Sequence, residues 1–158
     1  MSHEQLRELA ELVEGRKVAA LGTLHEGAPY VSMVPFALLE DGSAFVIHVS
    51  ELAAHTQDML TDPRVSLLIT QSESAETLPQ SLARVTVLGQ AKQIDEESAD
   101  YARAMARYLA RFPDSEPMFG FADFSLFGIR PASLRWIGGF AAAQSLTAEE
   151  FAIAVRGA

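Results

Sequence analysis

The segment 45–70, FVIHVSELAAHTQDMLTDPRVSLLIT, constrains the fold more than any other part of the chain. Residues 45–49 and 65–69 are apolar runs rich in β-branched and aromatic side chains, and each has the length of a strand. Between them apolar residues recur at helical spacing, and Asp62-Pro63 ends the helical pattern. The segment therefore predicts a strand, a short helix and a second strand.

The corner between the first strand and the helix is a candidate anion site. Ser50 stands where an N-cap residue belongs, and His55 follows within the first part of the helix. A helix N-terminus favours a negatively charged ligand because it presents free N–H groups and the positive end of the dipole. We therefore expect the Ser50 hydroxyl, these N–H groups and His55 to form a site that suits a phosphate.

The rest of the chain is expected to alternate strands with a few helices. Ser2 with Gln5, and Thr147 with Glu150, each have the pattern of a capping box at a helix start. Helices are expected at 3–14, at 96–111 and after Thr147, and strands at 17–24, 29–39, 45–49, 65–69, 84–94, 124–129 and 133–137.

Three breaks interrupt the later strands. Gly89 suggests a bulge, Arg130-Pro131 separates the last two strands, and Gly138-Gly139-Phe140 ends the strand pattern. About seven strands result, most of them joined by tight turns, so the sheet should be largely antiparallel. A small barrel of six or more strands, in a single domain over 1–158, is the economical solution because closure removes exposed edges.

The charge balance argues against nucleic acid and membrane partners. The chain has 12 Lys and Arg against 21 Asp and Glu, a net charge of −9, and such a surface repels polyanions. The strongest basic patch is a helical stripe of Arg103, Arg107 and Arg111. We expect this stripe to be a solvated face paired with the acidic residues at the start of the same helix, namely Glu96, Glu97 and Asp100.

The composition also limits the compartment and the chemistry. The chain has no cysteine, which excludes disulfides, thiolate catalysis and cysteine-ligated metals, and this composition fits a cytoplasmic protein. No apolar run reaches the roughly 20 residues that span a bilayer, and the N-terminal pattern is not that of a signal peptide. Nucleotide-loop, zinc-protease and nucleophile-elbow motifs are absent. The histidines, His3, His25, His48 and His55, are too scattered to predict a metal site.

Four polar residues suit a flat, phosphorylated cofactor. Ser32 lies on the second strand, Ser50 and His55 lie at the corner, and Arg84 begins the fifth strand. Each also has a structural explanation, as a helix cap, a residue on the flank of a helix or a surface charge at a strand end. The residues by themselves thus predict a soluble, β-rich domain with an anion corner.

Four stretches in this order resemble a known superfamily. They are GAPYVSMVPF at 27–36, HVSELAAHTQDMLTDPRVSLLI at 48–69, ARVTVLGQA at 83–91 and FSLFGIRPASLRWIGGF at 124–140. Together they resemble the FMN-binding split-barrel superfamily typified by pyridoxamine 5′-phosphate oxidase, and within it the haem-utilisation branch. The resemblance implies a mainly β fold with flanking helices (α+β), an antiparallel six- or seven-stranded split β-barrel.

The resemblance also implies a homodimer that holds FMN between its subunits. It assigns cofactor contacts to the strand carrying Ser32, to the corner, to the start of the fifth strand and to the segment containing Gly139 and Phe140. The cofactor-binding residues implied in this way are Ser32, Met33, Val34, Val49, Ser50, His55, Arg84 and Trp136.

Two departures from the superfamily leave several functions open. The phosphate-binding Arg of the oxidases is replaced by Ser32, and the region after Gly139 lacks their basic residues, which argues against pyridoxamine phosphate oxidation. The haem-degrading relatives use a C-terminal histidine as the iron ligand, and no histidine follows His55. The first hypothesis is therefore an FMN-dependent oxidoreductase whose substrate the sequence does not identify. The alternatives are a haem-binding or haem-degrading protein, or a cofactor-less dimeric binding module.

Overall fold

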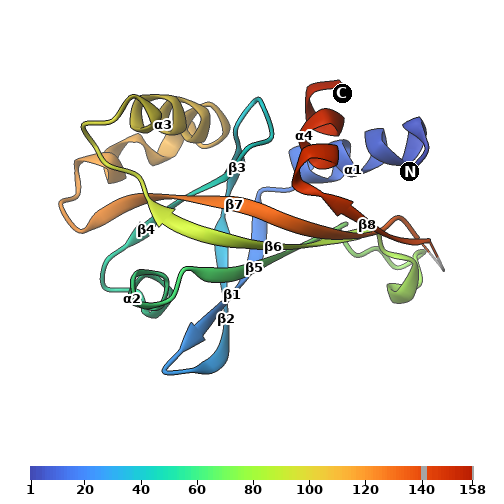
Figure 1. Ribbon diagram of the computed structural model, residues 1–158, viewed down its shortest axis with the longest axis horizontal. Coiled ribbons are helices and arrows are strands. Elements are labelled where there is room, and N and C mark those ends of the chain that lie inside the picture. Colours follow the sequence, from blue (N-terminus) through green and yellow to red (C-terminus); the bar gives the residue numbers. More distant parts are fainter. Residues whose placement is uncertain (140–141, 158) are drawn as a thin grey trace.

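The computed structural model describes residues 1–139 and 142–157, and an antiparallel sheet dominates it (Figure 1). Its strands are β1 (Val18–His25), β2 (Ala28–Pro35), β3 (Ala37–Leu38), β4 (Phe45–Ser50), β5 (Arg64–Thr70), β6 (Arg84–Gln93), β7 (Phe124–Ile137) and β8 (Ala143–Thr147). The order across the sheet is β2-β1-β5-β6-β7-β4-β3, and β8 pairs with β7. The helices are α1 (His3–Gly15), α2 (Ala54–Thr61), α3 (Ala99–Arg111) and α4 (Ala148–Gly157), and short 3-10 helices occupy Pro79–Ser81 and Pro113–Gly120.

The sheet curls until its two ends meet. The end strands β2 and β3 are separated in the chain by Phe36 alone, and the Phe36 N–H donates to the Lys17 carbonyl beside β1. The extended stretch 28–38 therefore pairs with β1 through residues 28–35 and with β4 through residues 37–38. This architecture confirms the predicted antiparallel split barrel with flanking helices.

Two apolar cores hold the helices to the sheet. The larger core fills the inner face of the curl, where Phe36, Phe45 and Phe151 of α4 pack ring against ring with centroids 5.7–5.9 Å apart. α1 and α4 also pack against each other on the right of Figure 1. The smaller core lies under α3, where Ala104 and Tyr108 are buried against β3 and β4.

The end of the sheet differs from the prediction in two ways. β7 runs unbroken through Arg130-Pro131, because the proline lies at a register shift opposite Leu88 and Gly89, where a missing N–H is tolerated. The bulge predicted at Gly89 is confirmed, and a Cβ there would lie 2.5 Å from the Arg130 carbonyl oxygen. The strand β8 was not predicted. The predicted break begins at Gly138, directly after β7, and its third residue, Phe140, lies outside the described residues.

The arginine stripe of α3 has different partners from those predicted. Arg103 pairs with Glu40 and Asp41 on the β3–β4 turn, at 3.6 Å and 2.8 Å, and not with acidic residues of its own helix. The other two arginines reach Glu14 near the end of α1. The stripe therefore fastens α3 to α1 and to the sheet. Among the described residues, no helix combines the length and apolar character needed to cross a membrane.

Candidate functional site

The helix cap predicted at Ser50 does not form. α2 begins at Ala54 with Ala53 as its N-cap, and no side chain caps it. Ser50 is the last residue of β4, and its Oγ donates to Asp123 Oδ2 at 3.1 Å while accepting from the Leu52 N–H at 3.2 Å. A carboxylate therefore stands beside the hydroxyl that was expected to receive phosphate, and it would repel an anion.

Ser32 and His55 are brought into direct contact. Ser32 lies opposite Leu21 in the sheet register, on the face of β2 that turns toward α2, and its Oγ lies 3.0 Å from Nδ1 of His55. The second ring nitrogen of His55, Nε2, makes no hydrogen bond to the described residues. Burial lowers the pKa of His55, although the nearby Asp58 carboxylate partly offsets this effect. The imidazole is therefore neutral at neutral pH.

A second polar group lies beside this pair at the same end of the barrel. The buried Asp58 of α2 accepts from Thr23 Oγ1 at 2.8 Å and from His25 Nδ1 at 2.7 Å. Burial alone would raise the pKa of Asp58, but these hydrogen bonds outweigh it and hold that pKa below its usual value. The hydrogen bond that His25 donates to Asp58, followed by the charge of Asp58, raises the pKa of His25. This group ties α2 to the β1–β2 hairpin.

The His25–Asp58 pair predicts a pH-dependent stability. His25 is protonated in both folded and unfolded chains below its ordinary pKa of 6.5, so the pair contributes fully there and is lost as the pH rises through the raised folded pKa. At the acid end the contribution falls as the pH drops through the lowered pKa of Asp58, whose ordinary value is 3.8. We expect the melting temperature to fall as the pH rises from the ordinary pKa of His25 through its raised folded pKa, and His25→Gln to flatten this decline. Equal slopes in the two proteins, followed by circular dichroism, would contradict the prediction.

The remaining residues of the predicted site are spread over the barrel. Arg84 lies on β6, with β1 and β5 between it and β2, and its Nη1 donates to the Leu82 carbonyl at 2.8 Å. Trp136 is buried in the core, as are Val34 and Val49, whereas Met33 points outward and is 63% exposed. Within one chain, the structure therefore groups Ser32 with His55 and leaves Arg84 and Trp136 elsewhere.

Sequence reasoning missed the Thr23–Asp58–His25 group. Asp58 follows His55 by three residues on α2, so helical spacing alone places the two side chains on neighbouring positions of one helix face. The partners of Asp58 come from β1, more than 30 residues earlier in the chain. The local sequence pattern does not predict such a long-range contact.

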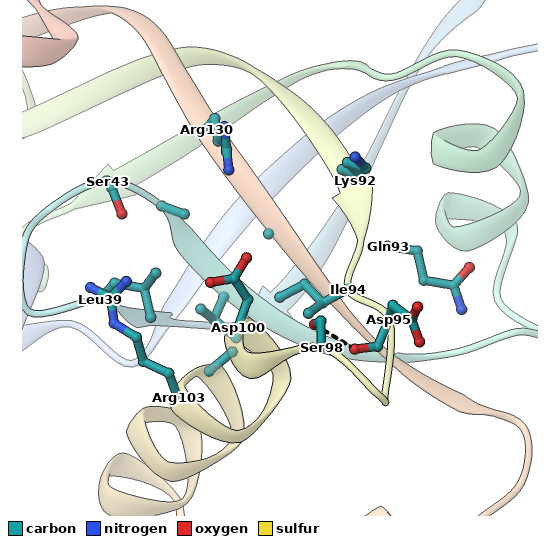
Figure 2. Close-up of a pocket in the computed structure, with 14 residues that line it drawn as sticks. Leu39, Ser43, Lys92, Gln93, Ile94, Asp95, Ser98, Asp100, Arg103 and Arg130 are labelled. Atoms are coloured by element: carbon teal, nitrogen blue, oxygen red, sulfur yellow. Dashed lines mark hydrogen bonds between the residues drawn. The ribbon is translucent and has the colours of Figure 1, made fainter.

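A hollow of the surface lies elsewhere, between the start of α3 and strands β4, β6 and β7 (Figure 2). Its volume is about 250 Å³, below the roughly 300–1,000 Å³ typical of ligand pockets. Lys92, Arg103 and Arg130 line it together with Asp95 and Asp100, so its charges are mixed, and its lining includes no histidine. We therefore place the candidate functional site at the Ser32–His55 contact.

Comparisons with known proteins identify relatives over most of the chain. The family model described as pyridoxamine 5′-phosphate oxidase matches residues 6–137. The chloroplastic heme oxygenase HOZ of Arabidopsis thaliana is 36% identical over 141 residues, which are 87% of this chain and 41% of that protein. The heme oxygenase HutZ of Vibrio cholerae is 24% identical over 90% of this chain and 81% of its own length.

A solved structure that resembles this chain also belongs to a protein named for heme. The heme binding protein from Mycobacterium smegmatis superposes with a TM-score of 0.84 and is 33% identical, over 94% of this chain and 60% of that one. The chain thus spans less than two thirds of the length of the Arabidopsis and mycobacterial proteins.

The predicted FMN cofactor, and with it the FMN-dependent oxidoreductase, is wrong. The heme oxygenases HOZ and HutZ and the mycobacterial heme binding protein carry heme, and not flavin, in their names. In the structure the Ser50 hydroxyl, which was expected to face a phosphate, donates to Asp123 Oδ2.

Proposed function

This chain belongs to the pyridoxamine 5′-phosphate oxidase family, and from that premise we propose that it is a haem-binding protein. The observation that carries the proposal is the 36% identity to a heme oxygenase over 87% of the chain. The mycobacterial heme binding protein, with 33% identity over 94% of the chain, supports it independently.

The residues beside the candidate site fit a haem group. Haem requires an iron ligand such as imidazole and a flat apolar surface for the porphyrin. His55 supplies a neutral imidazole, and large apolar side chains are exposed next to Ser32 and before α2. These side chains are Tyr30, which lies two residues before Ser32 on the same face of β2, and Leu52. Bound haem would supply oxygen and electron chemistry, while the chain supplies binding, orientation and exclusion of water.

We further propose that the protein is a homodimer through the outer face of its sheet. On this face, the strand register aligns two rows of uncharged residues across β2, β1, β5 and β6. The outer face consists of Met33, Ala20, Leu68 and Thr86 in one row and Val31, Gly22, Ser66 and Leu88 in the other. Its four large apolar side chains are 40–68% exposed, and an apolar patch of this kind on a sheet is typical of an interface. Since β2 carries both this face and Ser32, a second copy would lie beside the haem site.

Haemin titration of the purified chain tests the proposed function. We expect a saturable Soret band with one haem per chain at micromolar concentrations, because an imidazole ligand and an apolar surface bind haem together. Serum albumin and a heat-unfolded sample of the same chain are the controls for specific and non-specific binding. A linear, non-saturating increase in absorbance, equal to that of the unfolded sample, would contradict haem binding.

Haem degradation is the second candidate function, because two of the relatives are named heme oxygenases. Adding ascorbate in air to the haem complex, with catalase present to remove peroxide, separates the two candidates. Loss of the Soret band favours degradation, and a stable band favours binding alone.

A further inference from the structure

The four histidines differ in whether a ring nitrogen can reach a metal. His48 is enclosed by aromatic rings: it stacks on Phe119 with centroids 3.9 Å apart, and the rings of Tyr108 and Phe124 lie within 6 Å. His3 lies in the first turn of α1, on the side of the molecule away from α2 in Figure 1. Neither residue lies near the exposed apolar side chains of β2.

His25 and His55 both lie at the barrel end that carries these side chains, but their surroundings differ. His25 is exposed, lies at the tip of the β1–β2 hairpin, is followed by Glu26 and is paired with Asp58. His55 is half-buried and follows the apolar sequence Leu52-Ala53-Ala54. A porphyrin needs apolar contacts around its iron ligand and loses affinity beside unpaired carboxylates, since its propionates are anionic. The surroundings therefore favour His55.

Ser32 contacts one ring nitrogen of His55 and leaves the other without a partner among the described residues. Its Oγ lies 3.0 Å from Nδ1, and when Nδ1 carries the proton it donates to this oxygen. Nε2 then keeps its lone pair and makes no hydrogen bond to the described residues. Histidines that bind metals generally donate their other N–H to a fixed acceptor, which orients the ring and selects the tautomer.

We propose that His55 is the axial iron ligand of this chain through Nε2, and that Ser32 is a positioning residue that holds the ring through its contact with Nδ1. The inference rests on the proposed haem binding and goes beyond it by naming the ligand. Ser32 and His55 then act as a unit that couples β2 to α2 at the edge of the sheet.

Four variants of the full chain test the assignment: His55→Ala, His25→Ala as the matched control, Ser32→Ala and Ser32→Thr. The readouts are haemin affinity, the iron–histidine stretching band in resonance Raman spectra of the ferrous complex, and the melting temperature without haem. We expect His55→Ala to lose the iron–histidine band and to bind haemin at least about 10-fold more weakly. Added imidazole should restore the absorption spectrum. His25→Ala should keep the band.

The serine variants separate positioning from a structural role. Ser32→Ala should shift the iron–histidine band and weaken haemin binding about 10-fold or more, while Ser32→Thr, which keeps the hydroxyl, should restore both. An unchanged spectrum and affinity in His55→Ala, or loss of the band in His25→Ala alone, would overturn the inference and leave the proposed function intact. Absence of haemin binding by the unaltered chain would overturn both.

Discussion

Replacing Trp136 by alanine is expected to lower the free energy of unfolding by about 3–5 kcal/mol, the usual range for truncating a buried tryptophan. The side chain is 1% exposed and belongs to the core on the inner face of the curled sheet, where it pairs across the strands with Val85. A single domain is stable by only about 5–15 kcal/mol, so this loss would move the unfolding midpoint strongly. Urea unfolding followed by circular dichroism, at one fixed protein concentration, measures the change.

Trp136→Phe is the matched variant. It keeps most of the buried ring but removes the indole N–H, so it separates the effect of side-chain volume from that of the N–H group. The indole Nε1 is buried without a hydrogen-bond partner among the described residues, so phenylalanine removes an unsatisfied donor together with part of the ring. We expect it to cost no more than about 1–2 kcal/mol. If Trp136→Ala unfolded at the same urea concentration as the unaltered chain, the residue would not be part of the core. Its predicted role as a cofactor contact would then regain support.

Local sequence signals predicted the features whose partners are close in the chain. The capping box of Ser2 and Gln5 is present at the start of α1, and Thr147 with Glu150 makes the reciprocal bonds at α4. In both cases all the groups involved lie within three residues, so pattern alone determines the contact. The positions of most strands followed from the same local alternation of apolar and polar residues, although β8 was not predicted and the strands expected at 124–129 and 133–137 form the single strand β7.

Features that depend on distant partners could not be predicted in this way. Ser50 has the sequence position of a helix cap, but Asp123, 73 residues later, competes for its hydroxyl, and α2 starts four residues beyond Ser50. Asp58 became part of the site only through contacts with β1. Ser32 and His55 were chosen from the sequence as separate candidates, and the resemblance to a family supported both. Their contact with each other joins residues 23 positions apart, which periodicity does not predict.

Introducing a charge into the outer face is expected to separate the proposed dimer. Leu68 lies on β5, between β1 and β6, and is 40% exposed in the single chain. Under two-fold symmetry, Leu68→Glu would bury a carboxylate from each subunit, and an unpaired buried charge costs about 3 kcal/mol or more. This corresponds to dimer dissociation that is at least about 100-fold more favourable. Size-exclusion chromatography with light scattering should show the mass falling from twice 17.1 kDa to 17.1 kDa.

Leu60→Glu is the matched control, because Leu60 is 53% exposed but lies on α2, away from the outer face. It adds the same charge to a chain whose net charge is already −9, so it tests whether repulsion alone dissociates the subunits. We expect this variant to keep the mass of the unaltered chain. Dissociation of both variants would indicate general repulsion, and a Leu68→Glu protein that stays dimeric would show that the two copies meet elsewhere. Because β2 belongs both to the outer face and to the Ser32–His55 contact, a monomeric Leu68→Glu should also bind haemin more weakly if the second copy completes the site.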